Sequence, residues 1–440
     1  MTTPVPRSQS DKSQNARGID PGNIAGVDAE KNGVPRPDLP GPGVLSDDAN
    51  WFDVSDNRLK LIQHPDDRLQ ALMGLIEQAQ SSLKLFFYIF EADNIGQRVL
   101  DALIDACNRG VAVELMVDGF GSNGAPRDFF DPLQEAGGNF AIFCPRFSTS
   151  YLVRNHQKIL ISDNRRAMLG GFNIGNEYFG PQPGEDAAIQ DESRWEDLGV
   201  VIEGPEVARL SEYYKDLSHW VTNTNNQIHL LQKMVHQWKP GNGKLQWLIG
   251  GPNSHLSQWA QAVKADLEQA RRFDLVSAYF SPGQGLLRRI ARLGKRGQGR
   301  LVLAGKTDNA ATIGASRLLY GFLLKRGARL FEFQPRRLHS KLIIIDDVVY
   351  IGSANFDVRS LFINVEMMLR IEDKAFANHA RLMVDGLCEE SKLITKEFYD
   401  KRKGPLTWLR WAVSYFLVCV LDYTVSRRLN FGSEESEWRS

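Results

Sequence analysis

The chain has 440 residues, of which 42% are hydrophobic and 24% are charged. This length is enough for two domains of ordinary size, and the composition is typical of a soluble globular protein. The 53 basic and 53 acidic side chains give a formal net charge of zero. Bulk electrostatics therefore give no argument for a nucleic-acid partner, and we expect none.

Residues 1–45 differ from the rest of the chain, because they are rich in Pro, Gly, Asn and Asp and poor in aromatic residues. This composition predicts a disordered tail. The first residues, MTTPVPRSQSDKSQ, contain no apolar run, so no secretory signal is expected. The four cysteines show no close spacing and are interpreted as reduced thiols in a cytosolic setting: Cys107, Cys144, Cys388 and Cys419.

The first compact segment, residues 46–222, alternates between helical and strand patterns. Helical spacing over 66–79 is followed by an apolar run over 83–90, which predicts a buried strand. An amphipathic helix over 95–108 and a strand over 111–117 then complete a β-α-β unit with a parallel pair of strands.

Two loops in this segment lie where they can matter for function. Residues 119–126 are Gly-rich and follow a strand, at the end of an α/β sheet where sites usually lie. Residues 177–194 are rich in Gly, Pro and acidic residues, and either cover a site or form a solvated insertion. A strand over 198–202 and a helix over 206–221 complete the segment.

The same order of elements returns over residues 223–400, after a polar stretch at 222–243. Its predicted strands are 247–249, 273–280 and 301–304, and its predicted helices are 257–270, 285–293 and 315–325. The repetition predicts an α/β fold of two duplicated halves, with mixed sheets flanked by helices. A basic cluster in the second half is interpreted as a solvated helix face: Arg288, Arg289, Arg292, Lys295, Arg296 and Arg300.

One short stretch occurs twice, as NHQKILISDNRRAMLGGFN and as LHSKLIIIDDVVYIGSAN. Both copies read His-x-Lys-x4-Asp, followed by Gly-small-x-Asn. A lone His-x-Lys pair on a strand is usually a wet surface pair, but two copies with the same offsets favour a functional site. The candidate catalytic residues are His156, Lys158 and Asp163 in the first copy and His339, Lys341 and Asp346 in the second.

The spacing of these residues suits phosphate chemistry. In a strand, residues two apart share a face, so each His lies beside its Lys. Lysine can hold phosphoryl oxygens, and histidine can attack phosphorus or move a proton near neutral pH. Two copies would supply a site without metal, in which a nucleophile faces an acid/base. Asp163 and Asp346 have the opposite parity and lie beside turns, so both are interpreted as structural ties.

These residues resemble the paired HKD motifs of the phospholipase D superfamily. The first copy has six residues between its Asp and the following Gly, as the superfamily pattern has, whereas the second has five, so its turn is one residue shorter. The resemblance implies two phospholipase D-like halves with a single active site at their interface. It also implies that Asn173, Asn355 and Ser353 bind the substrate phosphate, and that Asp197 and Glu366 orient the histidines.

Over residues 50–395 the chain further resembles bacterial cardiolipin synthases of the phospholipase D type. Stretches that carry this resemblance include SRWEDLGVVIEGPEV and GSANFDVRSLFINVE. We expect the shorter form, without N-terminal transmembrane helices. The resemblance implies that His156 attacks phosphatidylglycerol to give a phosphohistidine, and that His339 acts as general acid and base in forming cardiolipin. No cofactor is expected, and no Cys/His cluster suggests a metal.

The segment 401–440 contains an uncharged run, 411–421, whose 11 residues are too few to span a bilayer core of about 30 Å. Basic residues flank this run. The segment also contains residue types found at membrane interfaces: Trp408, Trp411, Tyr415 and Tyr423. We therefore predict a helix lying on a membrane, with the protein peripheral to the cytoplasmic side of the cell membrane. The alternative is a core helix packed on the second half.

Three other functions share part of this pattern. A phospholipase D would use water as acceptor, and a superfamily nuclease would use the same site. A non-enzymatic membrane scaffold would need neither histidine. Neutral charge and the aromatic C-terminal segment argue against the nuclease. The oligomeric state is not predicted by the sequence.

Overall fold

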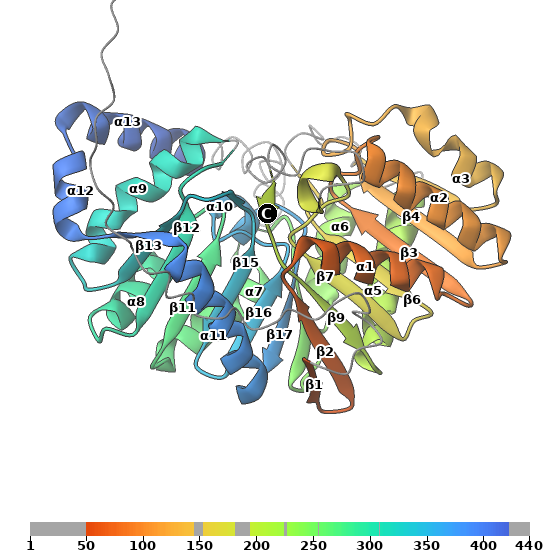
Figure 1. The fold of residues 1–440 in the computed structure, drawn as a ribbon, viewed down its shortest axis with the longest axis horizontal. Helices are drawn as coiled ribbons and strands as arrows, with labels where there is room; N and C mark the ends of the chain where they lie inside the picture. The colour runs from red at the N-terminus through yellow and green to blue at the C-terminus, as the bar shows by residue number, and fades with distance from the viewer. Residues whose placement is uncertain are drawn as a thin grey trace, which may run out of the picture. The chain divides into compact units, whose positions relative to one another are not determined.

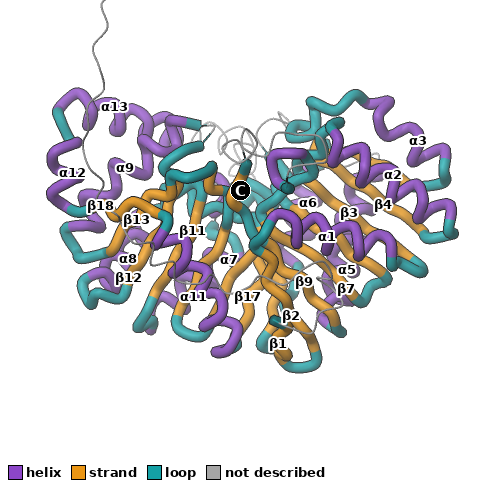
Figure 2. Tube along the Cα trace, viewed as in Figure 1, coloured by secondary structure: helices purple, strands orange, loops and turns teal. Residues whose placement is uncertain are grey.

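A computed structural model describes residues 50–144, 153–180, 194–223, 227–253, 255–307 and 309–421. These residues form two eight-stranded mixed sheets flanked by helices (Figures 1 and 2). The predicted α/β class is therefore confirmed. The predicted tail 1–45, most of the loop 177–194 and the end of the segment 401–440 lie outside the described residues.

The first sheet has the strand order β1-β2-β9-β7-β6-β3-β4-β5. Its strands are β1 (Trp51–Val54), β2 (Asn57–Ile62), β3 (Ser82–Phe87), β4 (Ala112–Asp118), β5 (Asn139–Phe143), β6 (Lys158–Ser162), β7 (Arg166–Gly170) and β9 (Gly199–Glu203). The helices of this half are α1 (Pro65–Glu77), α2 (Asn94–Asn108), α3 (Asp131–Glu135) and α5 (Glu206–Thr222), with 3-10 turns η1 (Arg127–Phe130) and η2 (Asn176–Tyr178).

The second sheet has the order β10-β17-β16-β15-β11-β12-β13-β18. Its strands are β10 (Leu245–Gly250), β11 (Phe273–Ser277), β12 (Gly299–Ala304), β13 (Arg329–Phe333), β15 (Lys341–Ile345), β16 (Val348–Gly352), β17 (Glu366–Glu372) and β18 (Ser391–Ile394). The helices are α6 (Ile228–Gln237), α7 (Gln258–Gln269), α8 (Gln284–Gly294), α9 (Ala310–Leu324), α10 (Val358–Phe362), α11 (Lys374–Glu389), α12 (Lys396–Arg402) and α13 (Pro405–Tyr415), followed by a π-helical turn η3 (Phe416–Leu421).

The two sheets repeat one pairing scheme. In the first, β3 and β4 are parallel and β3 is antiparallel to β6, with Phe87 opposite Lys158. In the second, β11 and β12 are parallel and β11 is antiparallel to β15, with Ser277 opposite Lys341. The predicted β-α-β unit and the predicted duplication therefore correspond to the observed strand order, and both motif lysines occupy the same place in their sheets.

The halves are joined by short strand contacts and by a shared core. β8 (Trp195–Glu196) pairs in parallel with β14 (Arg337–Leu338), and an isolated bridge joins Asn155 to Val365. One hydrophobic cluster contains buried residues of both sheets, among them Ile159 and Ile344. Because apolar faces of both sheets are buried together, the ends of β6 and β15 are fixed relative to each other.

Several elements differ from their sequence predictions for local reasons. The polar stretch 222–243 contains α6, whose Leu231 and Val235 are buried against the shared core. The predicted strand 83–90 ends at Phe87, because the next backbone amides bond side chains: Ile89 N donates to Asn173 Oδ1 at 3.1 Å. Such bonds replace the hydrogen bonds between strands at the point where the chain turns toward the motif residues.

The C-terminal segment has two different faces. Trp411 on α13 is 2% exposed, and its ring stacks on Tyr399 of α12 with centroids 5.6 Å apart. The opposite side of α13 leaves large apolar residues exposed. Within the described residues no single helix is long and apolar enough to cross a membrane, whereas α12 with the stretch 405–421, bent by 96°, meets that test as a pair by length and composition alone.

Candidate active site

The structure brings the two motif histidines together. His156 and His339 lie two residues before β6 and β15, and their ring centroids are 6.5 Å apart. Their side chains are only 13% and 9% exposed. One phosphoryl group placed between rings at this separation can contact both, as a site with a nucleophile and an acid/base requires.

Each histidine is anchored on the opposite half by its backbone. The amide of His156 donates to Val365 O at 2.8 Å, and the amide of His339 donates to Glu196 O at 2.8 Å. Val365 precedes β17 of the second sheet, whereas Glu196 belongs to β8 in the first half. The hydrogen bonds are therefore equivalent and crossed, and the site is held only while the two halves are joined.

The orienting carboxylates cross between the halves in the same way. His339 Nδ1 lies 2.6 Å from Asp197 Oδ2, and His156 Nδ1 lies 3.3 Å from Glu366 Oε2 and 3.1 Å from Ser353 O. A carboxylate at Nδ1 fixes the ring orientation and the tautomer. Nε2 is then the ring nitrogen left for the substrate in both histidines.

Strand register identifies these carboxylates as equivalent residues. Gly170 pairs with Gly199 in the first sheet, and Gly352 pairs with Met368 in the second. Asp197 and Glu366 each lie two residues before that pairing partner, and both are fully buried. The sequence prediction named these two residues but did not say that each would face the histidine of the other half.

Glu366 is held by several donors beyond His156. Its oxygens accept hydrogen bonds from Ser353 Oγ at 2.5 Å, Ser360 Oγ at 2.8 Å and Asn364 Nδ2 at 3.4 Å. Asp197 instead accepts the amide of Leu198 at 2.8 Å, besides facing His339. The negative charge near His156 is therefore shared among more donors than the charge near His339.

Burial dominates the electrostatics of the site. It lowers the pKa of His156 and the pKa of His339 to about 4 each, and the neighbouring lysines add to the effect. Burial also holds the pKa of Lys158 well below its ordinary value. Burial alone would raise the pKa of Asp197 and of Glu366, but the facing histidine and the nearby cations together outweigh burial and lower both pKa values. The site thus combines ionised carboxylates with imidazoles that release protons easily.

Both motif lysines lie beside the histidines. Lys158 Nζ donates to His156 O, and Lys341 Nζ donates to His339 O. Lys158 and Lys341 are 2% and 1% exposed, so each amine is held at the site by its strand and by a backbone carbonyl. A buried amine next to a reacting phosphate acts as a fixed point charge.

Aromatic rings enclose the two imidazoles, and the sequence prediction did not include them. The Tyr88 ring lies 4.8 Å from the His156 ring, and the Lys158 amine lies 5.0 Å from the Tyr88 ring centroid. Trp195 lies 5.1 Å from the ring of His339. The signal available in the sequence was position, because Tyr88 lies near the end of the predicted strand 83–90 and Trp195 comes two residues before Asp197.

The motif aspartates lie at the far ends of the motif strands. Asp163 accepts hydrogen bonds from the backbone amides of residues 80–82, and Asp346 accepts those of Arg271 and Arg272. Their φ angles of 55° and 48° are in the left-handed region, as tight turns at these positions require. Neither aspartate contacts a motif histidine. Their contacts agree with the interpretation that both hold turn backbone in place, and give no support for a direct role in catalysis.

The three residues expected to bind phosphate have different surroundings. Ser353 donates its hydroxyl to Glu366 at 2.5 Å, and its carbonyl oxygen lies 3.1 Å from His156 Nδ1. Asn173 Oδ1 accepts the amide of Ile89, and its Nδ2 donates to Tyr178 Oη at 2.9 Å. Asn355 is 4% exposed, and its Oδ1 is buried without a hydrogen-bond partner among the described residues.

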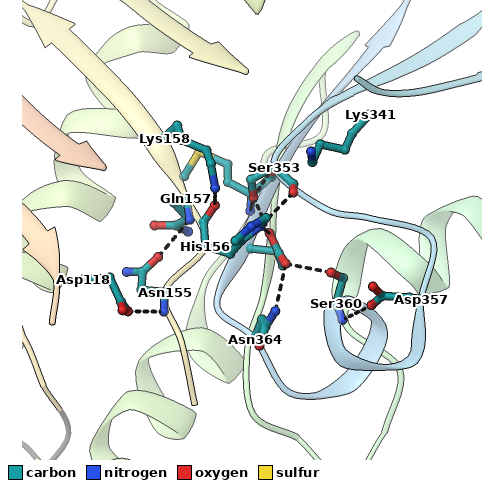
Figure 3. Close-up of polar contacts among 12 residues, drawn as sticks. Asp118, Asn155, His156, Gln157, Lys158, Lys341, Ser353, Asp357, Ser360 and Asn364 are labelled. Atoms are coloured by element: carbon teal, nitrogen blue, oxygen red, sulfur yellow. Dashed lines mark hydrogen bonds and ion pairs between the residues drawn. The ribbon is translucent and has the colours of Figure 1, made fainter. Parts of the chain in front are cut away.

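Asp118 is a further residue that the sequence prediction missed. Its Oδ2 accepts the amide of Asn155 at 2.8 Å, and its Oδ1 accepts the amides of Phe120 and Gly121 at 2.9 Å each. The contact with Asn155 fixes the backbone immediately before His156 (Figure 3). Burial raises the pKa of Asp118 to about 6.

Comparisons with known proteins agree with this geometry. The family model described as "Cardiolipin synthase, PLD-like domain" matches residues 72–216 and 263–386. The chain is 30% identical over 354 residues to cardiolipin synthase A of Pseudomonas entomophila, covering 78% of this chain and 71% of that protein. It is 30% identical over 370 residues to cardiolipin synthase B of Salmonella typhimurium, covering 80% of this chain and 84% of that protein.

A solved structure shows the same fold at low sequence identity. The phosphatidylserine synthase of Haemophilus influenzae Rd KW20 superposes with a TM-score of 0.63 at 14% identity, over 84% of this chain and 94% of that one. The matched family segments contain both motif copies, and the two halves carry them in equivalent positions. The chain therefore belongs to the cardiolipin synthase family of phospholipase D-like phosphatidyltransferases.

Proposed function

We propose that the chain transfers a phosphatidyl group from one phosphatidylglycerol to the hydroxyl of a second, releasing glycerol and forming cardiolipin through a phosphohistidine. The observation that carries the proposal is the crossed pairing of two buried imidazoles with carboxylates of the opposite half. That arrangement supplies two histidines with Nε2 available and fixed tautomers. Double-displacement phosphoryl transfer needs one of them as nucleophile and the other as acid/base.

In the first step, Nε2 of His156 attacks phosphorus. The N–P bond forms, the bond from phosphorus to the glycerol oxygen breaks, and His339 gives its proton to that oxygen. In the second step, His339 takes the proton of the incoming phosphatidylglycerol hydroxyl as its oxygen attacks phosphorus. The N–P bond then breaks and the free His156 is restored.

The surroundings of the two rings favour this division of roles. His156 Nδ1 faces the uncharged carbonyl of Ser353 at 3.1 Å, and a carboxylate that several other donors share at 3.3 Å, which suits a neutral nucleophile. His339 Nδ1 faces Asp197 at 2.6 Å, which better supports an imidazolium. A phosphodiester anion arriving between the rings would raise the pKa of His339 from its lowered value and load the ring with the proton that the first step uses.

Lys158 and Lys341 are proposed to hold the non-bridging phosphoryl oxygens, where negative charge is present in the substrate and in the transition state. Asn173 and Asn355 are proposed as further contacts to the phosphate. The unpartnered Oδ1 of Asn355 supports a polar contact at that position once the substrate is bound. These lysine and asparagine side chains are deeply buried, which would also limit the access of water as a competing acceptor for the phosphatidyl group.

Lipid mass spectrometry on the purified full chain with phosphatidylglycerol tests this function. Wild type should produce cardiolipin and glycerol in equal amounts, and His156→Ala and His339→Ala should each reduce the rate by at least about 10³-fold. His219→Ala, an exposed histidine on α5, is the matched control. Phosphatidic acid without cardiolipin would indicate a phospholipase D, cleavage of DNA a nuclease, and unchanged cellular cardiolipin in His156→Ala a scaffold; each result contradicts the proposal.

We further propose that the protein is peripheral to the cytoplasmic side of the cell membrane and binds it through the segment 401–440. Eight of the eleven exposed large hydrophobic residues in the described chain are on α13 and η3: Leu406, Trp408, Leu409, Val413, Phe416, Leu417, Val420 and Leu421. Such a concentration is typical of a helix that lies in a membrane interface. The inner face, packed through Trp411, would hold that helix on the second half.

Substitution on the exposed face tests this membrane contact. Leu409→Glu with Phe416→Glu should release the protein from isolated membranes, whereas Leu382→Glu, which is 68% exposed on α11, should not. Protease access in right-side-out and inverted vesicles reports the side of the membrane, and protection in inverted vesicles would contradict the cytoplasmic assignment.

We also propose that residues 46–222 and 223–400 act as the two phospholipase D-like halves, with 401–440 as the membrane segment. The division of strands between the sheets, β1 to β9 in one group and β10 to β18 in the other apart from the β8–β14 pair, supports these boundaries.

A further inference from the structure

A basic groove on the second half is lined by residues of α8, α9 and α12 and of the turns that follow α8, α9 and α12. Figure 1 shows α9 and α12 beside the helix α13. It consists of two adjacent hollows of about 480 and 350 Å³, which share Phe322 and Arg326. Seven cations and one acid line the two hollows together: Arg288, Arg292, Lys295, Lys325, Arg326, Lys396 and Lys403, with Asp400. In a chain whose formal net charge is zero, this is a strong local excess of positive charge.

The structure separates these cations from others of the basic cluster at 288–300. Arg300 is paired with Asp274 and Asp385, and Arg289 is paired with Glu268 at 2.6 Å. Those two arginines have carboxylate partners. In the groove, Arg292 donates to the carbonyls of Leu267 and Glu268, and Arg326 to that of Phe322, and these acceptors carry no charge. The cations that line the groove outnumber its acid, and that acid, Asp400, is already paired with Lys396. The groove is therefore suited to an external anion.

Apolar and aromatic walls accompany the charge. The Arg326 guanidinium lies 3.7 Å from the ring centroid of Phe322, and the Lys403 amine lies 6.0 Å from that of Tyr399. Leu318 and Leu324 line the same hollow. Cations above apolar walls suit a ligand that carries a phosphate next to a hydrocarbon chain better than they suit a fully hydrated ion.

One aromatic pair connects the groove to the helix α13. Tyr399 lines the groove, and its ring stacks on Trp411, whose helix exposes Leu409 and Val413 to solvent. α12 and α13 both pack on α9. Positive charge at headgroup level next to an apolar helix face is the arrangement that an anionic bilayer attracts.

We propose that this groove binds the phosphate-bearing headgroups of an anionic lipid bilayer, while the apolar face of α13 enters the acyl boundary beside it. The proposal rests on the proposed function, since that function places the protein at a membrane of anionic phospholipid. It assigns α8 and α9 to membrane binding along with the C-terminal segment. Binding would then need both anionic charge in the bilayer and the cations of the groove.

Vesicle flotation of the full chain tests the proposal without turnover. Vesicles of phosphatidylcholine are compared with vesicles that also contain phosphatidylglycerol. The variant Arg288→Glu with Lys403→Glu reverses one exposed charge in each hollow. Its matched control, Arg98→Glu with Lys233→Glu, reverses two exposed charges on α2 and α6. Circular dichroism and the unfolding midpoint verify that each variant is folded, and Arg288→Gln with Lys403→Gln provides a milder change.

Wild type and the control should prefer the anionic vesicles, and the groove variant should lose at least about tenfold in partitioning to them, with the Gln variant intermediate. Equal binding by wild type and the folded groove variant would overturn the proposal. So would displacement by inorganic phosphate beyond the effect of sodium chloride at matched ionic strength, because the groove would then recognise free phosphate. A chain that binds vesicles in this way but makes no cardiolipin would fail the proposed function and leave the groove intact.

Discussion

His339 and Asp197 face each other across the junction of the two halves, with Nδ1 and Oδ2 2.6 Å apart although the residues are 142 positions apart in the sequence. The equivalent pair, His156 and Glu366, joins the halves in the opposite direction at 3.3 Å. Each imidazole therefore depends on a carboxylate that the other half supplies. The two sheets form one catalytic unit, in which neither half contains a complete histidine–carboxylate pair.

Replacing Asp197 with Asn should remove the charge that supports protonated His339 while keeping the shape of the side chain. We expect kcat for cardiolipin formation to fall roughly 10³- to 10⁴-fold, because an amide can stabilise the wrong tautomer and cannot balance an imidazolium. KM for phosphatidylglycerol should change less than about threefold. Initial rates measured beside Asp105→Asn, an exposed position on α2, test this. A loss smaller than tenfold would contradict the role of Asp197.

Ser353→Ala separates positioning from phosphate binding. The Ser353 hydroxyl donates to Glu366 at 2.5 Å, so its removal should disturb the carboxylate that faces His156. We expect kcat to fall about 10-fold or more, with KM for phosphatidylglycerol within about twofold. A raised KM with unchanged kcat would instead indicate that the hydroxyl binds the substrate phosphate, as the sequence resemblance implied.

Asp163→Ala tests whether the aspartate of the motif is structural. Its carboxylate accepts the amides of residues 80–82 and lies at the far end of β6 from His156. The substitution should lower the free energy of unfolding by about 1–3 kcal/mol, because three backbone amides lose their acceptor. The kcat of the folded protein should stay within about twofold. Urea unfolding and initial rates are measured on the same samples, and Asp346→Ala is the matched variant in the second half. A large loss of kcat in a variant that keeps its full stability would contradict the structural role of Asp163.

Nitrogen NMR of histidine-labelled protein should show both motif imidazoles neutral at pH 6. Burial lowers the pKa of each to about 4, below the ordinary 6.5, so each resonance should titrate between pH 5 and 3. His156→Gln and His339→Gln assign the two signals. A motif histidine that titrates above pH 6 in the free enzyme would contradict the stated effect of burial.

Titrating the histidines directly is preferable to measuring the free energy of unfolding against pH, because different buried groups change that free energy in opposite directions. A His whose folded pKa is lower than its unfolded pKa weakens the fold as pH falls from 6.5 to 4. Asp118 and Asp357, whose pKa values burial raises to about 6, strengthen the fold as pH falls from 6 to 4. The two effects oppose each other over the same range, so the global free energy of unfolding does not isolate the histidines.

The sequence was informative where the relevant pattern is local. The two motif strands, the β-α-β spacing and the turns at Asp163 and Asp346 depend on neighbouring residues, and the structure has them as predicted. The strands begin at the motif lysines, so each histidine lies two residues before its strand and not on it. Even the shorter second turn appears, since Ser162 pairs with Arg166 but Ile345 pairs with Val348.

The rest of the site depends on long-range contacts. Glu366 was named from its place after the second motif, but its contact with His156 spans 210 residues and requires the bridge between Asn155 and Val365. Ser353 donates a hydrogen bond to the same Glu366. The motif alone does not show this bond, and the family resemblance implied only that Ser353 binds the substrate phosphate. α6 was missed because its few apolar residues are buried by the shared core and not by a repeated local pattern.

The most direct test of a site shared by both halves uses an activated substrate on the variant His339→Ala. A phosphatidyl ester of p-nitrophenol needs no general acid for its leaving group, so His156 can still attack it, while the missing base prevents resolution. We expect a burst of about one equivalent of nitrophenol and a phosphatidyl adduct on the peptide that contains His156. No adduct, or an adduct on a different residue, would contradict it.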